Sequence, residues 1–101
     1  MKKTFVAIST VGPNRDPSKG VREQPFWDEH AAFIDRLVEE GFLLMGGPLL
    51  DEGGMPRGAL LIVNAEDEIG VREKLNDDPW FEKGILKLDS VKCWEIFIDA
   101  W

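Results

Sequence analysis

The sequence predicts an α+β domain in which strands and helices follow one another in the order β-α-β-β-α-β. Runs of β-branched and apolar residues bounded by glycine or proline, such as Thr4–Val11, are typical of strands. The segment after Pro25 instead repeats apolar residues at helical spacing, and a weaker helical pattern follows Glu66. With 101 residues, 44% of them hydrophobic, the chain is expected to form a single domain, residues 1–101, with a modest core.

The first half of the chain contains a long loop, a helix and an irregular strand after its opening strand. The loop, Pro13–Pro25, is longer than most connections, so it is either a pocket wall or lid, or a disordered insertion. The first helix is predicted over Pro25–Glu40, with proline at its first position and Gly41 at its end. Phe42–Leu50 reads as a strand, and the proline within it indicates a bulge or a sheet edge.

The second half of the chain repeats the pattern of strand, helix and strand. A hairpin loop, a third strand, a weaker helix and a long last strand are expected at Asp51–Arg57, Gly58–Asn64, Glu66–Asn76 and Ile85–Ile98. Asp78 and Pro79 are typical of a helix cap and a first helical position, and therefore predict a short turn of helix. The alternation of the last strand is broken around Ser90, which predicts a bulge near its middle.

This order of elements is the ferredoxin-like split βαβ arrangement, with a four-stranded antiparallel sheet and both helices on one face. The other sheet face would then be bare. Because the strands are rich in apolar residues, we expect a second copy to cover that face, which would give a dimeric α+β barrel with a two-fold axis. The 4 Trp and 6 Phe residues agree with a covered interface, although they could also simply fill the core.

Charge and cysteine content exclude several classes of protein. Lys and Arg number 12 against 19 Asp and Glu, and the net charge of −7 argues against binding to nucleic acids or anionic membranes. Cys93 is the only cysteine, so it forms no disulfide within the chain and is expected to be a small core residue of the last strand. No apolar run reaches membrane-spanning length and the N-terminus makes a poor signal peptide, so a cytoplasmic protein is expected.

The only histidine, His30, lies within the stretch FWDEHAAF of the first predicted helix. It falls on the apolar stripe of that helix with Trp27 and Ile34, and not on the charged face with Asp35. A lone histidine on such a stripe is usually a core residue bonded to a backbone carbonyl. Histidine can also accept and donate protons near neutral pH, so a functional role stays open.

Several short motifs occur together along the chain. They are Trp27–Phe33, Glu40–Phe42, Gly46–Leu49, Asp77–Trp80 and Val91–Ile96. As a set, spread from about residue 4 to 98, they resemble the YCII-related (YciI-like) family. The resemblance implies a homodimeric α+β barrel with one pocket per subunit, and an acid–base pair that matches His30 and Asp78. Relatives include a dehydrochlorinase of a chlorinated hydroxyhydroquinone, and similar folds include muconolactone isomerases. Most members have no assigned reaction, and the long loop is found only in part of the family.

The pair has a clear chemical logic. A carboxylate bonded to one ring nitrogen fixes the tautomer of a histidine, so the other nitrogen can face a substrate as a base. Asp78 also has the simpler interpretation of a helix cap. Other candidates for substrate binding are Ser9, which could equally be an ordinary strand hydroxyl, Arg22, which could hold an anion or belong to a solvated loop, and Trp27 and Trp80, which could wall an aromatic pocket or fill the core.

The leading hypothesis is a small, cofactor-independent enzyme that uses His30 and Asp78 on a small cyclic or aromatic organic substrate, as an isomerase or a dehydrochlorinase-like lyase. The alternative is a non-catalytic ligand-binding or accessory homodimer. A haem-degrading monooxygenase is a further possibility within the barrel fold, with His30 as the one candidate haem ligand. A single histidine and unclustered carboxylates predict no metal site.

Overall fold

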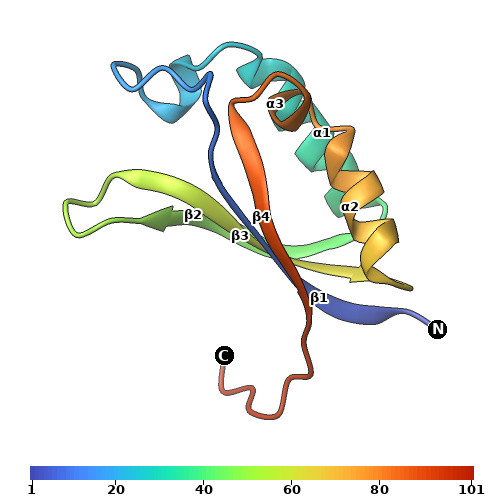
Figure 1. Ribbon diagram of the computed structural model, residues 1–101. Coiled ribbons are helices and arrows are strands. Elements are labelled where there is room, and N and C mark those ends of the chain that lie inside the picture. Colours follow the sequence, from blue (N-terminus) through green and yellow to red (C-terminus); the bar gives the residue numbers. More distant parts are fainter.

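The structure, a computed structural model of residues 1–101, is an antiparallel sheet with its helices on one face (Figure 1). The strands are β1 (Lys3–Val11), β2 (Leu43–Leu50), β3 (Pro56–Ala65) and β4 (Leu86–Cys93). The helical elements are the 3₁₀ turn η1 (Val21–Glu23), α1 (Trp27–Glu39), α2 (Glu68–Asn76) and the short α3 (Pro79–Glu82). None of these helices combines the length and the apolar character that crossing a membrane requires.

The sheet has the strand order β2-β3-β1-β4, which confirms the predicted ferredoxin-like topology. β2 lies at one edge, as the proline in its sequence indicated, and β4 at the other. The predicted bulge in the last strand is also present: Ile8 and Ser9 of β1 pair with Ser90 and Leu88, so Asp89 between them is the extra residue. The edge position of β2 and the bulge in β4 therefore agree with the sequence-based predictions.

The core lies between the helices and the sheet face that they cover. It consists of 11 buried apolar residues, among them Phe5 and Val63 of the central strands and Phe33, Leu37 and Val71 of α1 and α2. Burying a side chain of this kind contributes roughly 1.5–3 kcal/mol, which is more than the propensity of these short helices could supply. Packing on the sheet is thus what fixes the positions of α1 and α2.

The first helix begins at Trp27 and not at Pro25, so that part of the prediction is wrong. Phe26 has a left-handed backbone conformation, with φ of 63°, and this turns the chain just before the helix. The carbonyl of Pro25 accepts a hydrogen bond of 2.8 Å from the indole Nε1 of Trp80. A contact with a residue so far along the chain is what sets this boundary. The C-terminal end agrees with the prediction, since Gly41 has φ of 77°.

The last strand is shorter than predicted. β4 ends at Cys93 instead of Ile98, because its ladder with β1 ends at the pair Phe5 and Cys93 and one further bond from Trp94 N to the carbonyl of Thr4. Residues 94–101 then leave the sheet (Figure 1). The prediction for Cys93 is also wrong, since this residue is exposed. It lies beside the buried Phe5 but on an edge strand that no helix covers at this point.

Candidate active site

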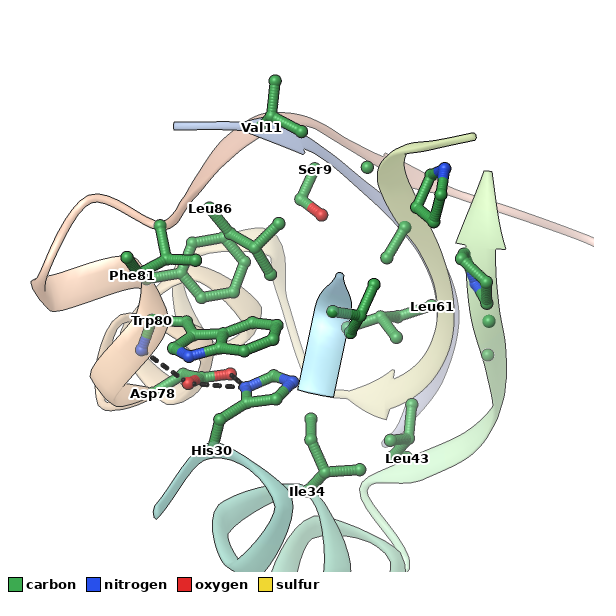
Figure 2. Close-up of a pocket in the computed structure, with 18 of the residues that line it drawn as sticks. Ser9, Val11, His30, Ile34, Leu43, Leu61, Asp78, Trp80, Phe81 and Leu86 are labelled. Atoms are coloured by element: carbon green, nitrogen blue, oxygen red, sulfur yellow. Dashed lines mark hydrogen bonds and ion pairs between the residues drawn. The ribbon is translucent and has the colours of Figure 1, made fainter. Parts of the chain in front are cut away.

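A cavity of about 520 Å³ opens between the helices and the concave side of the sheet (Figure 2). Its lining comes mainly from α1, α3, β1, β2 and β3, and most of the side chains are apolar, including Ile34, Leu43, Leu61, Phe81 and Leu86. A volume of this size and an apolar lining with a few polar groups are typical of sites that bind small organic molecules.

His30 and Asp78 meet at one wall of this cavity. The Nδ1 atom of His30 lies 2.9 Å and 2.8 Å from the two carboxylate oxygens of Asp78. The histidine side chain is 13% exposed and the aspartate side chain 1%. The first helix and the short α3 bring the two residues together because both pack on the same face of the sheet (Figure 1). The structure thus joins two candidates that lie 48 positions apart in sequence.

The carboxylate of Asp78 is held in place by its own helix. It caps α3, with Pro79 in the first turn, and its Oδ1 accepts a hydrogen bond of 2.9 Å from the backbone N–H of Trp80. The sequence left open whether Asp78 is a cap or a partner of His30. The structure shows both contacts on one carboxylate, so the cap fixes the orientation in which the carboxylate meets the imidazole.

Trp80 stacks on one face of the imidazole of His30. The rings of His30 and Trp80 are parallel within 5°, with centroids 3.9 Å apart, and Trp27 packs obliquely at 5.9 Å from the imidazole. Trp80 is buried and its indole N–H is bound to Pro25, so the stacking surface is itself fixed. The imidazole therefore has one well-defined position.

The fixed position of the imidazole determines which of its two nitrogens can reach a molecule in the cavity. An ionised carboxylate only accepts hydrogen bonds, so Nδ1 of His30 carries the proton between the two residues. Figure 2 shows the other ring nitrogen, Nε2, directed into the cavity. In the neutral ring Nε2 is an acceptor, and it can therefore take up a proton from a molecule in the cavity. No group of three or more His, Cys, Asp or Glu side chains is placed to hold a metal ion.

Ser9 supplies a second polar group on the cavity wall. Its side chain is buried, with 4% exposed, and Oγ has no hydrogen-bond partner in the protein. In Figure 2 this hydroxyl points into the cavity from β1. A buried hydroxyl without a partner costs about 1–3 kcal/mol, so it is expected to find one in a bound molecule.

The Pro13–Pro25 loop forms part of the cavity wall. Arg15 and Arg22 of this loop line the cavity, and neither guanidinium group forms an ion pair with a carboxylate of the chain. Of the two alternatives that the sequence left open for this loop, the structure agrees with a wall and not with a disordered insertion. Its two arginines place positive charge beside an otherwise apolar cavity.

The loop is organised by Gln24, which the sequence analysis did not single out. This side chain is 3% exposed, accepts a hydrogen bond from Asp16 N and donates to the carbonyls of Asp16 and Lys19. Hydrogen bonds from Ser18 hold the pKa of Asp16 below its usual range and stabilise the turn further. A single glutamine next to a proline gives no recognisable pattern, so only the folded loop reveals its role.

The fold and the cavity together define a class of protein: a ferredoxin-like α+β protein with an apolar small-molecule cavity and one histidine–carboxylate pair at its wall. The family model of the YCII-related domain matches residues 5–95, and the chain belongs to this family. Among solved structures, it is similar to 5-chloro-2-hydroxyhydroquinone dehydrochlorinase (TftG) from Burkholderia phenoliruptrix AC1100 in complex with 2,5-dihydroxybenzoquinone. The two share 25% identity with a TM-score of 0.66, over 91% of this chain and 93% of that chain. No curated protein matches the chain.

Proposed function

We propose that this protein is a small cofactor-independent enzyme that transfers protons on a cyclic or aromatic organic substrate, with His30 as the general acid–base and Asp78 as its positioning partner. One observation carries the proposal: Nδ1 of His30 is bound to a buried carboxylate while Nε2 faces an apolar cavity. General acid–base catalysis by a positioned side chain contributes about 10²–10⁴-fold to the rate.

The proposed reaction begins when Nε2 of His30 removes a proton from the substrate. In an elimination, the electrons of the broken bond form a new double bond and chloride leaves with its own bonding electrons. In an isomerisation, the imidazolium returns the proton at another carbon. Asp78 stabilises the imidazolium in both cases, and the apolar walls keep water away from the charged intermediate.

The similarity to a dehydrochlorinase supports this class of substrate. That enzyme is named for a chlorinated hydroxyhydroquinone, and its structure contains a quinone with two hydroxyl groups. The cavity of this chain, at about 520 Å³, has room for a ring of that size. In our proposal Trp27 and Trp80 form an aromatic wall beside the ring, together with the His30 on which they pack. Ser9 Oγ bonds to a hydroxyl or carbonyl group, and Arg22 attracts an anionic or phenolate substituent.

We also propose that the protein functions as a homodimer in which the two bare sheet faces meet. Leu44 and Met45 of β2 are 52% and 53% exposed, although such side chains are usually buried. The face opposite the helices also carries Val6 of β1 and Leu60 of β3, which are partly exposed, beside a wide apolar groove. A second sheet packed at this face would bury them.

A non-catalytic ligand-binding homodimer is the alternative. It predicts that His30 is bonded to a backbone carbonyl and has no contact with Asp78. The hydrogen bond between the two side chains instead supports the catalytic proposal. The unpartnered hydroxyl of Ser9 agrees with ligand binding under either hypothesis.

The test uses His30→Gln and Asp78→Asn in assays with 5-chloro-2-hydroxyhydroquinone and lactones derived from catechols. Glutamine keeps a polar side chain but accepts no proton, so turnover by His30→Gln should fall about 10²–10⁴-fold while circular dichroism stays unchanged. Glu29→Gln, at an exposed neighbouring position of α1, is the matched control and should keep full activity. Full turnover by a folded His30→Gln protein would refute the proposal.

A further inference from the structure

The cavity with His30 contains two positive charges that no other group of the protein neutralises. Its charged or titratable lining residues are Arg15 and Arg22 of the Pro13–Pro25 loop, and His30 and Asp78, which are bound to each other. Neither arginine takes part in an ion pair or a cation–π contact. The lining therefore has an excess of positive charge, although the whole chain carries −7.

The other three arginines of the chain each have a partner. Arg57 and Arg72 bind carboxylates at 2.8 Å and 2.9 Å, and the guanidinium group of Arg36 lies 5.6 Å from the centre of the Phe33 ring. None of these three residues lines the cavity. The two arginines without a partner are thus the two that a molecule in the cavity can reach, and a bound anion would supply the partner that the protein does not.

The acidic residues of the same loop do not neutralise this charge. The carboxylate of Asp16 accepts hydrogen bonds from the backbone N–H and the hydroxyl of Ser18, at 2.9 Å and 2.6 Å. Glu23 is exposed, forms no ion pair and does not line the cavity. Arg15 is half-buried, so water hydrates its charge only in part. Because a partly desolvated charge without a counter-ion is unfavourable, an anionic ligand at this place is stabilising.

The start of the loop lies across the cavity from His30. Figure 2 shows Ser9 and Val11 of β1 on the side of the cavity opposite His30, and the loop leaves the sheet directly after Val11. Its first turn is fixed at this end of β1, because Arg15 N donates a hydrogen bond of 3.3 Å to the carbonyl of Gly12. The polar groups of the cavity therefore follow one another from His30, through the unpartnered hydroxyl of Ser9, to Arg15.

We propose that Arg15 and Arg22 bind a carboxylate group of the substrate, so that the substrate is a ring carboxylic acid. The inference rests on the proposed function and names the class of its substrate. The carboxylate lies at the loop, the ring fills the apolar middle of the cavity, and a carbon of the ring faces Nε2 of His30. A carboxylate has enough lone pairs for two guanidinium groups, and the planar fork of arginine matches its geometry.

The two arginines also match the charge that develops during proton transfer. When Nε2 of His30 takes a proton from a ring carbon, the imidazolium is balanced by Asp78. The ring keeps the electron pair of the broken C–H bond as an enolate, until a leaving group departs or the proton returns. Together with the carboxylate, the substrate then carries two negative charges opposite two guanidinium groups. Electrostatic attraction is therefore stronger in the deprotonated state than in the substrate, as catalysis requires.

Isothermal titration calorimetry with three small molecules tests the assignment without turnover. They are gentisate (a dihydroxybenzoate), hydroquinone, which lacks the carboxylate, and gentisamide, in which an uncharged amide replaces it. We expect the wild-type protein to bind gentisate at least about tenfold more tightly than either uncharged molecule, because charge-assisted hydrogen bonds are the strong ones. In Arg15→Gln and Arg22→Gln, affinity for gentisate should fall about tenfold or more, while affinity for gentisamide stays unchanged.

Lys19→Gln is the matched control, because it removes a positive charge from the same loop but not from the cavity lining. This variant should bind gentisate as tightly as the wild-type protein. An equal loss of affinity in Lys19→Gln and in the two arginine variants would show a general effect of charge and would overturn the inference. Equal affinities of the wild-type protein for gentisate and gentisamide, or no binding of gentisate, would overturn it as well.

His30→Gln separates this inference from the proposed function. The variant should lose turnover but should still prefer gentisate to gentisamide, because the two arginines are unchanged. Turnover that depends on His30 in a protein without this preference would refute the carboxylate site alone. A clear preference for gentisate combined with full turnover by His30→Gln would refute the acid–base role and leave the carboxylate site in place.

Discussion

Asp78 shows how one side chain can connect folding and chemistry. Its carboxylate caps α3 through Trp80 N and binds Nδ1 of His30, so the same oxygens start a helix and orient an imidazole. The sequence predicted the cap from Asp78 and Pro79 and the pairing from a family resemblance, and treated them as alternatives. They are compatible because a carboxylate has enough lone pairs for both bonds.

Replacing Ser9 by alanine tests the role of its buried hydroxyl group. Ser9→Ala removes a buried hydroxyl that has no partner, so the free energy of unfolding should stay the same or rise by up to about 1 kcal/mol. Affinity for the substrate should fall about tenfold, because the ligand loses one hydrogen bond. Urea denaturation and the KM measure the two effects. An unchanged KM would show that the hydroxyl does not contact the substrate.

At the scale of elements, the sequence predicted what depends on local pattern and missed what depends on distant contacts. The strand order, the bulge at Asp89 and the stop of α1 just before Gly41 follow from alternation and turn chemistry. The left-handed Phe26 could not be predicted, since a non-glycine residue in this conformation depends on contacts such as Pro25 with Trp80. For the site, residue types identified His30, but only the fold brought it to Ser9 and to the cavity.

Replacing Gln24 tests whether its hydrogen bonds hold the loop that carries Arg15 and Arg22. Gln24→Ala removes its hydrogen bonds to the backbone groups of Asp16 and Lys19, which then lose the partner that holds the loop together. We expect a loss of about 1–3 kcal/mol in local stability and faster amide hydrogen exchange throughout residues 13–25. Glu23→Ala, at the exposed neighbouring position, is the control and should leave exchange unchanged. Equal exchange rates in the two variants would show that Gln24 does not organise the loop.

At the scale of the whole molecule, the helices cover only one of the two sheet faces (Figure 1). Apolar side chains are exposed on the other face, along β2 and in residues 94–101. A small domain has few apolar side chains with which to build its core, so such exposure indicates a covered surface. The proposed homodimer accounts for this surface.

A homodimer predicts that thermal stability depends on protein concentration. Each tenfold increase in concentration should stabilise the folded dimer by about 1.4 kcal/mol, which raises Tm by a few degrees. Calorimetry over a hundredfold range of concentration measures this effect. In a Met45→Glu protein the dependence should be weaker, because a charge on the face where the two sheets would meet weakens the dimer. A wild-type Tm that does not change with concentration would contradict the homodimer.

The imidazole between Trp80 and Asp78 cannot turn over, because one face of the ring is stacked and one nitrogen is bound. Its free nitrogen therefore approaches any guest from one fixed direction. A proton delivered along a single line reaches only one of the two sides of a planar carbon. Where contacts such as that with Ser9 hold the guest in one orientation, any new stereocentre made in this cavity should consequently have a single handedness.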